Sequence, residues 1–276
     1  MKSIILHLRF PFSLFLLPVY LFSLSQNSGW RVSEAILLGL IWHLLVYPAS
    51  NALNSYYDQD EGPIGGLENP PQATKELYWV ALIFDVIAIA WSSLQWGFGV
   101  GLGILGYIAI SRAYSSYPIR LKQYPFLSWA IVGFFQGAYV FSLSGYALTD
   151  QLGDWLPALL SSGTLWAIYP MTQVYQHEED AKRGDRTLSL VLGVRGTFIF
   201  TACLFGLTSI GYIYLLQAEE RWIWLSSQVP IVGFFLFWMY RVFHHEKWAN
   251  FTFTMYFNGF SALLLNLVYL FFILKK

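Results

Sequence analysis

The chain has 276 residues, of which 56% are hydrophobic and only 12% are charged, whereas soluble domains carry about 25% charged residues. The mean hydropathy is +0.49 and the formal net charge is +0, so the composition indicates a membrane protein with no general attraction for nucleic acid. Cys203 is the only cysteine, which excludes an internal disulfide and leaves no Cys/His metal pattern. No protein partner is implied.

The N-terminus carries Lys2 and Arg9 before an apolar stretch, as a signal peptide does, but no A-x-A-like cleavage site follows. We therefore expect a retained first helix. A spanning helix needs about 20 mostly apolar residues, and roughly nine candidates are found in a single domain over residues 1–276. The predicted helices are 10–25, 34–56, 76–95, 97–114, 126–148, 155–175, 196–217, 222–243 and 250–274.

The basic residues fall mostly on one side of such a nine-helix arrangement. The loops on one side hold about twelve of the 16 Lys and Arg residues and the other side holds about four. This bias predicts a multi-pass protein of the cell's inner (cytoplasmic) membrane with its N-terminus and its rich loops in the cytoplasm. The smaller set is Arg31, Arg221, Lys275 and Lys276.

The stretch NALNSYYDQDEG, residues 51–62, gathers acids at the end of the second predicted helix. Asn51, Asn54, Asp58 and Glu61 are spaced to share one helical face, and Asn54 and Asp58 can offer oxygens to one cation. Gly62 and the glycines after it are expected to break the helix, so Asp60 could then turn inward.

Two features of the next two predicted helices have alternative interpretations. Asp85 lies well inside the third helix. An isolated carboxyl group there either indicates a functional site or is protonated and bonded to a neighbouring helix. Gly101, Gly103 and Gly106 spell G-x-G-x-x-G, but they lie inside an apolar segment and lack the strand that a dinucleotide site needs. Gly97 with Gly101, and Gly99 with Gly103, are instead spaced for close helix packing in lipid.

Basic residues that could bind a diphosphate follow both the fourth and the sixth predicted helix. The stretch YSSYPIRLK supplies Arg120 and Lys122, and the later loop supplies Lys182, Arg183 and Arg186. Such side chains form charge-assisted hydrogen bonds with phosphate. The alternative is that they are ordinary cytoplasmic loop residues.

The second acidic motif is YQHEEDAKRGDRTL, residues 175–188, after the sixth predicted helix. Gln176 and Asp180 are one turn apart, and Glu179 lies beside them. Clustered oxygen ligands without thiolate suit Mg²⁺, which binds through one or two carboxylates plus substrate phosphates. We therefore expect two half-sites that face each other across a helix bundle and hold a metal–diphosphate.

Together these motifs resemble the intramembrane prenyltransferases of the UbiA superfamily. The resemblance rests on N-S-Y-Y-D at 54–58, Q-H-E-E-D at 176–180 followed by Gly184 and Thr187-Leu188, and the Y-x-x-x-P-x-R-L-K stretch at 114–122. It covers nearly the whole chain. It implies an all-α polytopic protein with about nine transmembrane helices in one bundle around a central cavity.

The resemblance also assigns roles to residues. The metal ligands would be Asn54, Asp58, Glu61, Gln176 and Asp180, with Asp58, Asp180 and Glu179 in catalysis. The diphosphate would be bound by Lys75, Tyr114, Arg120, Lys122 and Lys182. The sequence departs from the family pattern at Ser55, Gly62 and Gln176, and Lys75 is the nearest cation to an arginine that the family often carries after the first motif.

The expected reaction is Mg²⁺-dependent transfer of an isoprenyl group from an allylic polyprenyl diphosphate to an aromatic or other lipophilic acceptor within the membrane lipid. The C–O bond breaks to leave an allylic cation, which aromatic faces stabilise and which the acceptor attacks. Asp180, Glu179 or His177 could serve as the base. The alternatives are an ion-coupled transporter that uses the acidic clusters and Asp85, and a membrane scaffold without catalysis.

Overall fold

The computed structural model describes residues 2–117 and 119–276, which form helices joined by short connections, with a single isolated β-bridge between Ile64 and Leu67. The all-helical prediction is confirmed. Seven helical stretches of the described residues are long and apolar enough to cross a membrane. They are Lys2–Gln26, Val32–Asp58, Glu76–Trp96, Pro125–Thr149, Leu188–Leu215, Ala218–His244 and Phe251–Leu274.

The two other predicted spans are also helical. They are α7 (Phe98–Ser115) and α10 (Trp155–Ile168), which continues into the 3₁₀ segment η4 (Tyr169–Gln173). Helices therefore lie at all nine predicted positions, whereas the number that cross the membrane stays a prediction.

The first predicted helix, 10–25, is broken into three pieces that begin earlier than expected. These are α1 (Lys2–Leu8), α2 (Phe10–Ser13) and α3 (Leu17–Gln26). Arg9 separates α1 from α2 in the left-handed region at φ 48°, and Pro11 and Pro18 stand at the starts of α2 and α3. A proline lacks the N–H that a continuing helix needs, so both are tolerated only near helix starts.

The second span contains a widened turn. It comprises α4 (Val32–Leu40), the π-helical segment η1 (Ile41–Val46) and α5 (Tyr47–Asp58). Pro48 stands at the start of α5, where its ring would clash with the carbonyl of an uninterrupted α-helix one turn earlier. The π turn accommodates this and carries the chain onward without a break.

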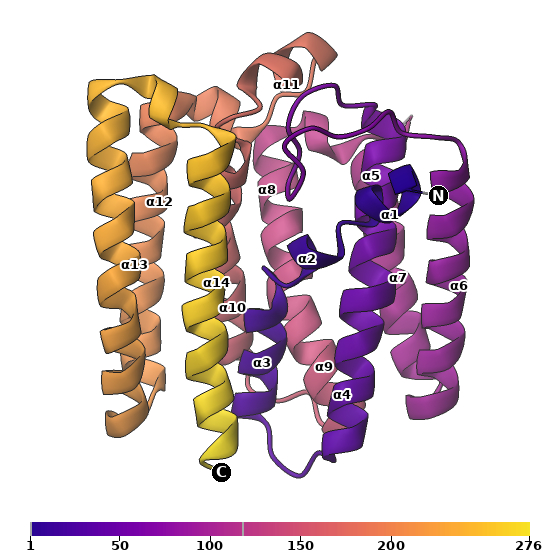
Figure 1. Ribbon diagram of the computed structural model, residues 1–276. Helices are drawn as coiled ribbons and strands as arrows, with labels where there is room; N and C mark the ends of the chain where they lie inside the picture. Colours follow the sequence, from indigo (N-terminus) through magenta and orange to yellow (C-terminus); the bar gives the residue numbers. More distant parts are fainter. Residues whose placement is uncertain (1, 118) are drawn as a thin grey trace. The chain divides into compact units, whose positions relative to one another are not determined.

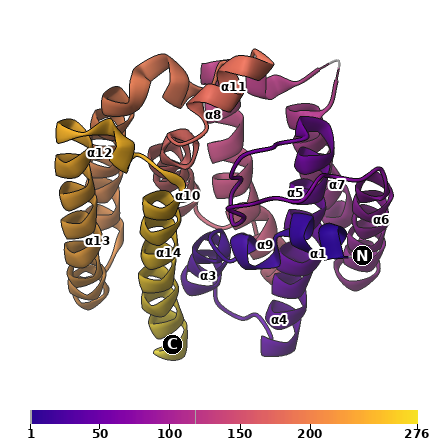
Figure 2. The same cartoon turned by 45° about the horizontal axis from the view of Figure 1, so that its top comes forward.

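The chain packs into two compact units. The expectation of a single domain stays a prediction. Unit 1 comprises Met1–Leu14, Asn27–Lys122 and Ser142–Gly153. Within it α5, α6 (Glu76–Trp96) and α7 lie side by side (Figures 1 and 2). Buried Ala49, Ala52 and Ala81 let α5 and α6 approach closely. Gly101 packs against Ser93 of α6, so the glycine-rich segment is a packing surface, as predicted.

Unit 2 comprises Phe15–Gln26, Gln123–Phe141 and Asp154–Lys276. Its core gathers Met171, Phe198, Trp238 and Phe257, which are almost fully buried. The remaining elements from residue 121 onward are η2 (Leu121–Gln123), α8 (Pro125–Gly133), η3 (Phe134–Tyr139), α9 (Val140–Thr149), α11 (His177–Arg183), α12 (Leu188–Leu215), α13 (Ala218–His244), η5 (Glu246–Trp248) and α14 (Phe251–Leu274). Helix α10 packs against α12, and α14 packs against α3 and α13.

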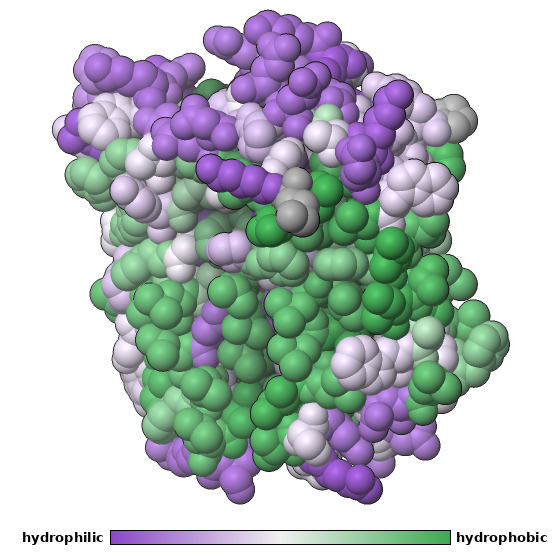
Figure 3. Space-filling model, turned by 45° about the vertical axis from the view of Figure 1, so that its right-hand side comes forward, coloured by the Kyte–Doolittle hydropathy of each residue, from purple (hydrophilic) through white to green (hydrophobic). Residues whose placement is uncertain are grey.

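The helices expose large apolar side chains that a water-soluble protein would bury. Leu94 is 88% exposed on α6 and Tyr214 is 81% exposed on α12. Figure 3 shows one face on which hydrophobic residues gather between two hydrophilic margins. Such a surface is suited to a lipid environment, which explains how 56% hydrophobic residues are accommodated.

Candidate active site

The first acidic motif crosses the end of α5, which ends before the break that was expected at Gly62. The helix ends at Asp58 because Gln59 adopts the left-handed conformation at φ 51°, where its N–H donates to the Ser55 carbonyl at 3.1 Å. Asn51, Asn54 and Asp58 therefore belong to one helix, but Glu61 does not. The predictions that Glu61 continues this helical face and that Gly62 ends the helix are wrong, because the break occurs at a residue that seldom adopts positive φ.

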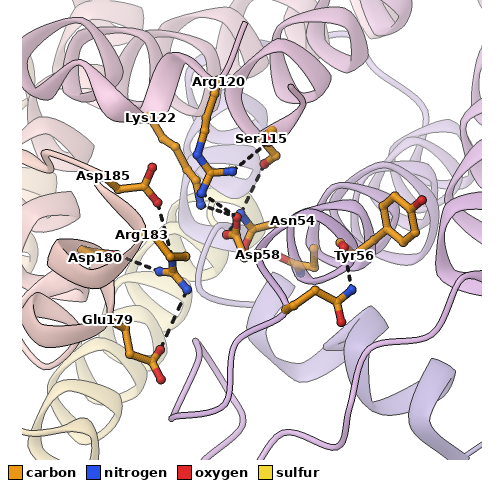
Figure 4. Close-up of polar contacts among 12 residues, drawn as sticks. Asn54, Tyr56, Asp58, Ser115, Arg120, Lys122, Glu179, Asp180, Arg183 and Asp185 are labelled. Atoms are coloured by element: carbon orange, nitrogen blue, oxygen red, sulfur yellow. Dashed lines mark hydrogen bonds and ion pairs between the residues drawn. The ribbon is translucent and has the colours of Figure 1, made fainter. Parts of the chain in front are cut away.

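Asp58 is the buried centre of a cluster in unit 1 (Figure 4). Its side chain is only 4% exposed. One oxygen, Oδ2, accepts a hydrogen bond from Asn54 Nδ2 at 2.8 Å. The other, Oδ1, is paired with Lys122 Nζ and lies 3.4 Å from Arg120 Nη2. Two cations thus share one carboxylate in this Asp58 cluster (Asn54, Asp58, Arg120 and Lys122).

Arg120 is held in a strained backbone conformation. Its φ is 41°, in the left-handed region, and the residue is 4% exposed. The guanidinium lies over the Tyr117 ring at 4.6 Å and Nη1 donates to the Ser115 carbonyl at 3.5 Å. Backbone strain of this kind persists only where surrounding contacts fix it and gathers at functional sites.

The second acidic motif forms the short helix α11 in unit 2 and the turn after it. Gln176 precedes the helix, and Gly184 at φ 77° ends it in a conformation that favours glycine. Asp180 is 5% exposed. Its Oδ1 accepts from Arg183 Nη2 at 2.9 Å, and its Oδ2 accepts from Thr187 Oγ1 at 3.3 Å.

Arg183 is shared by three carboxylates. Besides Asp180 it lies 3.4 Å from Asp185 Oδ2 and 4.0 Å from Glu179 Oε2 (Figure 4). Asp185 is 2% exposed, so two of the three acids are buried. This Asp180 cluster (Glu179, Asp180, Arg183 and Asp185) therefore gathers three carboxylates around one guanidinium.

The other predicted site residues lie outside these contacts. Glu61, Lys75 and Lys182 are exposed, whereas Tyr114 and Gln176 are half-buried. Their roles stay predictions. Sequence reasoning missed the central position of Arg183, although Asp180 and Arg183 are three residues apart on one helical face, while Lys182 is two residues from Asp180 and off that face.

His177 is the first residue of α11 and is titratable. Its Nε2 lies 2.8 Å from Ser189 Oγ, and Ser189 Oγ lies 3.0 Å from Thr197 Oγ1. Burial lowers the pKa of His177, and the carboxylate of Glu246 partly opposes that shift. The neutral ring is therefore favoured near neutral pH, which keeps His177 among the candidate bases.

The oxygen-rich ligand set of both clusters fits Mg²⁺. The groups are carboxylates and the Asn54 amide, with no thiolate, and hard cations prefer such oxygens. No three His, Cys, Asp or Glu side chains of the described residues converge to hold a metal by themselves. That is expected of Mg²⁺, which keeps waters and takes oxygens from substrate phosphate.

Asp85, the isolated acid of α6, has a partner. Arg112 of α7 pairs with Asp85 Oδ2 through Nη2 and also donates to it through Nε at 3.0 Å. An ion pair satisfies the carboxylate, so the structure lends no support to an ion pathway at Asp85.

Comparisons with known proteins agree on one family. A family model described as the UbiA prenyltransferase family matches residues 14–260. A 1,4-dihydroxy-2-naphthoate octaprenyltransferase of Haemophilus influenzae is 24% identical over 200 residues, which span 64% of each chain and so less than two thirds of that relative.

Solved structures share the fold. A UbiA homologue from Archaeoglobus fulgidus bound to DMAPP and Mg²⁺ aligns with a TM-score of 0.69 at 18% identity, covering 99% of this chain and 100% of that one. The same homologue bound to GPP and Mg²⁺ gives 0.69 at 19% identity with the same coverage. A homologue from Aeropyrum pernix K1 gives 0.68 at 16% identity, covering 95% of this chain and 97% of that one.

Proposed function

Because the chain belongs to the UbiA prenyltransferase family and is an integral membrane protein, we propose that it transfers an isoprenyl group from an allylic polyprenyl diphosphate to an aromatic or other lipophilic acceptor, with Mg²⁺. The observation that carries the proposal is the pair of buried acid clusters. Each holds at least one carboxylate against a basic side chain. The basic-residue bias of the sequence supports a reaction at the cytoplasmic side of the inner membrane.

The two clusters suit different ligands. The Asp180 cluster, which is rich in carboxylates, is suited to a cation, and the Asp58 cluster, which holds two basic side chains, is suited to a diphosphate. Asn54 donates through Nδ2, so its Oδ1 is the amide atom that can bind a cation. When bound, Mg²⁺ supplies neutralisation of the charge that develops on the leaving diphosphate.

Arg120 and Lys122 must change partners when the donor binds. Both are almost fully buried, and a buried cation that loses its carboxylate is costly unless another anion replaces it. Diphosphate oxygens are such an anion and accept charge-assisted hydrogen bonds from both side chains. Donor and metal therefore bind more tightly together than either does alone, because Asp58 becomes available as its cations move to the diphosphate.

The transfer itself breaks the allylic C–O bond, and the electron pair leaves with the diphosphate. An acceptor carbon attacks the resulting allylic cation and then loses a proton. His177 is favoured in its neutral form by burial, and Asp180 and Glu179 lie near it in sequence, so each remains a candidate for that proton. The relative that is named a 1,4-dihydroxy-2-naphthoate octaprenyltransferase supports a ring acceptor, and we take a phenolic or naphthoate ring as the first to test.

The direct experiment measures diphosphate released from C15–C20 allylic donors by the purified protein with an acceptor and Mg²⁺. Turnover should stop with a chelator and return when Mg²⁺ is added. Asp58→Ala and Asp180→Ala should each abolish most release, while the matched controls Glu68→Gln and Glu178→Gln, which change exposed acids in the same two regions, should retain it. Full activity in both alanine variants would refute the proposed roles, and ion uptake into liposomes without donor turnover would favour a transporter.

A further inference from the structure

Asp85 and Arg112 form an ion pair that the proposed chemistry does not use. The Asp85 side chain is 8% exposed and lies midway along α6, while the Arg112 side chain is 25% exposed and lies near the end of α7. Arg112 also lies over the ring of Tyr78, 5.9 Å from its centroid. Charged groups inside a membrane-spanning segment are costly, so a pair retained there needs a reason.

The space beside this pair is too small for a substrate. A cavity of about 10 Å³, lined by Ser50, Tyr107, Ser111, Asp85 and Arg112 among others, offers room for roughly one water molecule. This cavity is therefore no substrate site. Its polar lining includes Ser50 of α5 and Ser111 of α7, which points to an effect of the pair on how these helices meet.

Those two helices are joined by polar contacts at matching intervals. Ser50 Oγ of α5 lies 2.5 Å from Ser111 Oγ of α7. One turn further along both helices, Asn54 Nδ2 donates to Ser115 Oγ at 3.2 Å. One more turn along α5 comes Asp58, which meets Arg120 and Lys122 from the segment after α7 (Figure 4). We call these three contacts the α5–α7 ladder.

Arg112 directly follows Ser111, the α7 residue of the first rung. By binding Asp85 it fixes α7 against α6 beside that rung, and the register of the first rung sets the next two. We propose that Asp85 and Arg112 are positioning residues that hold the α5–α7 ladder in the register that brings Asn54, Arg120 and Lys122 onto Asp58. The catalytic part of this inference rests on the proposed function.

A small displacement of α7 would matter. One residue along an α-helix is a rise of about 1.5 Å and a turn of about 100°, so a shift by one position would turn Ser111 and Ser115 away from α5. A misplacement of about 1 Å in a reacting group can cost roughly 10²-fold in rate. The ion pair is directional, since one carboxylate oxygen accepts both Nε and Nη2, and it therefore opposes such a shift.

The register is tested without any activity. In a Cys203→Ser background, which has no other cysteine, Ser50→Cys with Ser111→Cys should form a disulfide readily in membrane vesicles, whereas Ser50→Cys with the exposed Ala109→Cys should not. Adding Asp85→Asn should slow the first cross-link several-fold, while Asp85→Glu should leave its rate near that of the parent. Equal rates with aspartate and asparagine at position 85 would overturn the proposed role.

The catalytic consequence is tested by kinetics. Asp85→Asn and Arg112→Gln should raise the donor KM by roughly 10- to 100-fold and leave the acceptor KM unchanged, and Asp85→Glu should restore most of the loss. The matched control is Glu219→Gln, which removes the carboxylate of the exposed Lys275–Glu219 pair in unit 2. A donor KM unchanged by Asp85→Asn, or an equal rise in both KM values, would overturn the positioning role.

The two proposals fail in different ways. A wild-type protein that turns over no donor refutes the proposed function, while the cross-linking result still decides whether Asp85 sets the register. If Asp85→Asn does not yield folded protein, Arg112→Lys keeps the charge but loses the paired donors of the guanidinium. That variant should show the same slower cross-link and higher donor KM, and wild-type behaviour in it would count against the proposal.

Discussion

The Asp58 and Asp180 clusters both hold buried charges against charges of opposite sign, but with opposite proportions of acidic and basic groups. In unit 1 a single carboxylate is shared by Arg120 and Lys122, which lie more than 60 positions later in the chain. In unit 2 a single cation, Arg183, is shared by three carboxylates of its own helix and the following turn. The first cluster depends on tertiary structure and the second is almost entirely local.

The difference in charge is as informative as the difference in distance along the chain. Carboxylates outnumber basic side chains in the contacts of the Asp180 cluster, whereas basic side chains outnumber carboxylates in those of the Asp58 cluster. We infer that substitution of Asp180 should chiefly change the response to metal, and substitution of the basic residues on Asp58 should chiefly change the response to the donor.

The largest effect is expected from Asp180→Asn. This change removes a buried charge from the carboxylate-rich cluster, so it should lower kcat/KM by about 10²- to 10³-fold and raise the Mg²⁺ concentration needed for half-maximal rate. Initial rates over a Mg²⁺ titration give both numbers. Glu178→Gln is the matched control on the exposed side of α11. An unchanged Mg²⁺ requirement would break the distinction between the clusters.

Lys122→Met should give the next largest effect, with a different signature. A hydrogen bond to a charged group contributes about 1.5–3 kcal/mol, so the donor KM should rise roughly 10- to 100-fold. Binding of Mg²⁺ alone, followed by calorimetry, should become tighter, because Asp58 then has one cation fewer to release. Lys247→Met, at an exposed lysine, serves as the control. Weaker binding of Mg²⁺ alone would contradict the exchange of partners at Asp58.

Arg183→Gln should destabilise the protein and make it more responsive to metal. Removing one partner from a buried ion pair costs about 3 kcal/mol or more, and here three carboxylates lose their shared cation. The melting temperature should fall, and Mg²⁺ should raise it more in the variant than in the wild type. The exposed Arg186→Gln is the control. Equal Mg²⁺-induced shifts in both proteins would argue against a metal at this cluster.

The smallest effect is expected from Gly184→Ala. At φ 77° an alanine side chain is strained, which costs about 1–2 kcal/mol, although nothing within 4 Å would clash with its methyl group. We expect a fall of a few degrees in melting temperature with little change in donor KM, because the turn only places Asp185 after α11. A large loss of donor affinity would show that this turn also shapes the unit 1 chemistry.

Much of the fold could be predicted because long apolar segments report helices directly. The boundaries at 76–95 and 250–274 agree with α6 and α14 to within a residue. Other ends were missed where no composition signal exists. Helix α12 begins at Leu188, earlier than predicted, because Thr187 caps it by accepting from Leu190 N, and the chain continues across a break at Gly193.

The local cluster was more predictable than the distant one. Arg183 could have been assigned from its three-residue spacing to Asp180, a pattern the sequence displays. Ser115 could not, because its contact with Asn54 joins positions 61 apart and depends on how α5 and α7 pack. Gln59 was missed for a related reason: its positive φ is imposed by context, and the residue type does not favour it.

The π-helical segment η1 changes the rotational position of α5 relative to α4, so each helix can direct its own set of side chains inward. Each residue added to or removed from a helix rotates everything beyond it by about 100°. By widening one stretch, Ile41–Val46 lets α4 direct Ala35 and Leu38 inward while α5 independently directs Ser50 and Asn54 toward α7. The second span is therefore one continuous helical stretch whose two parts, α4 and α5, have independent rotational positions. The 6 residues of η1 thus determine the direction of the Asp58 carboxylate at the end of the span, although they precede it in the chain.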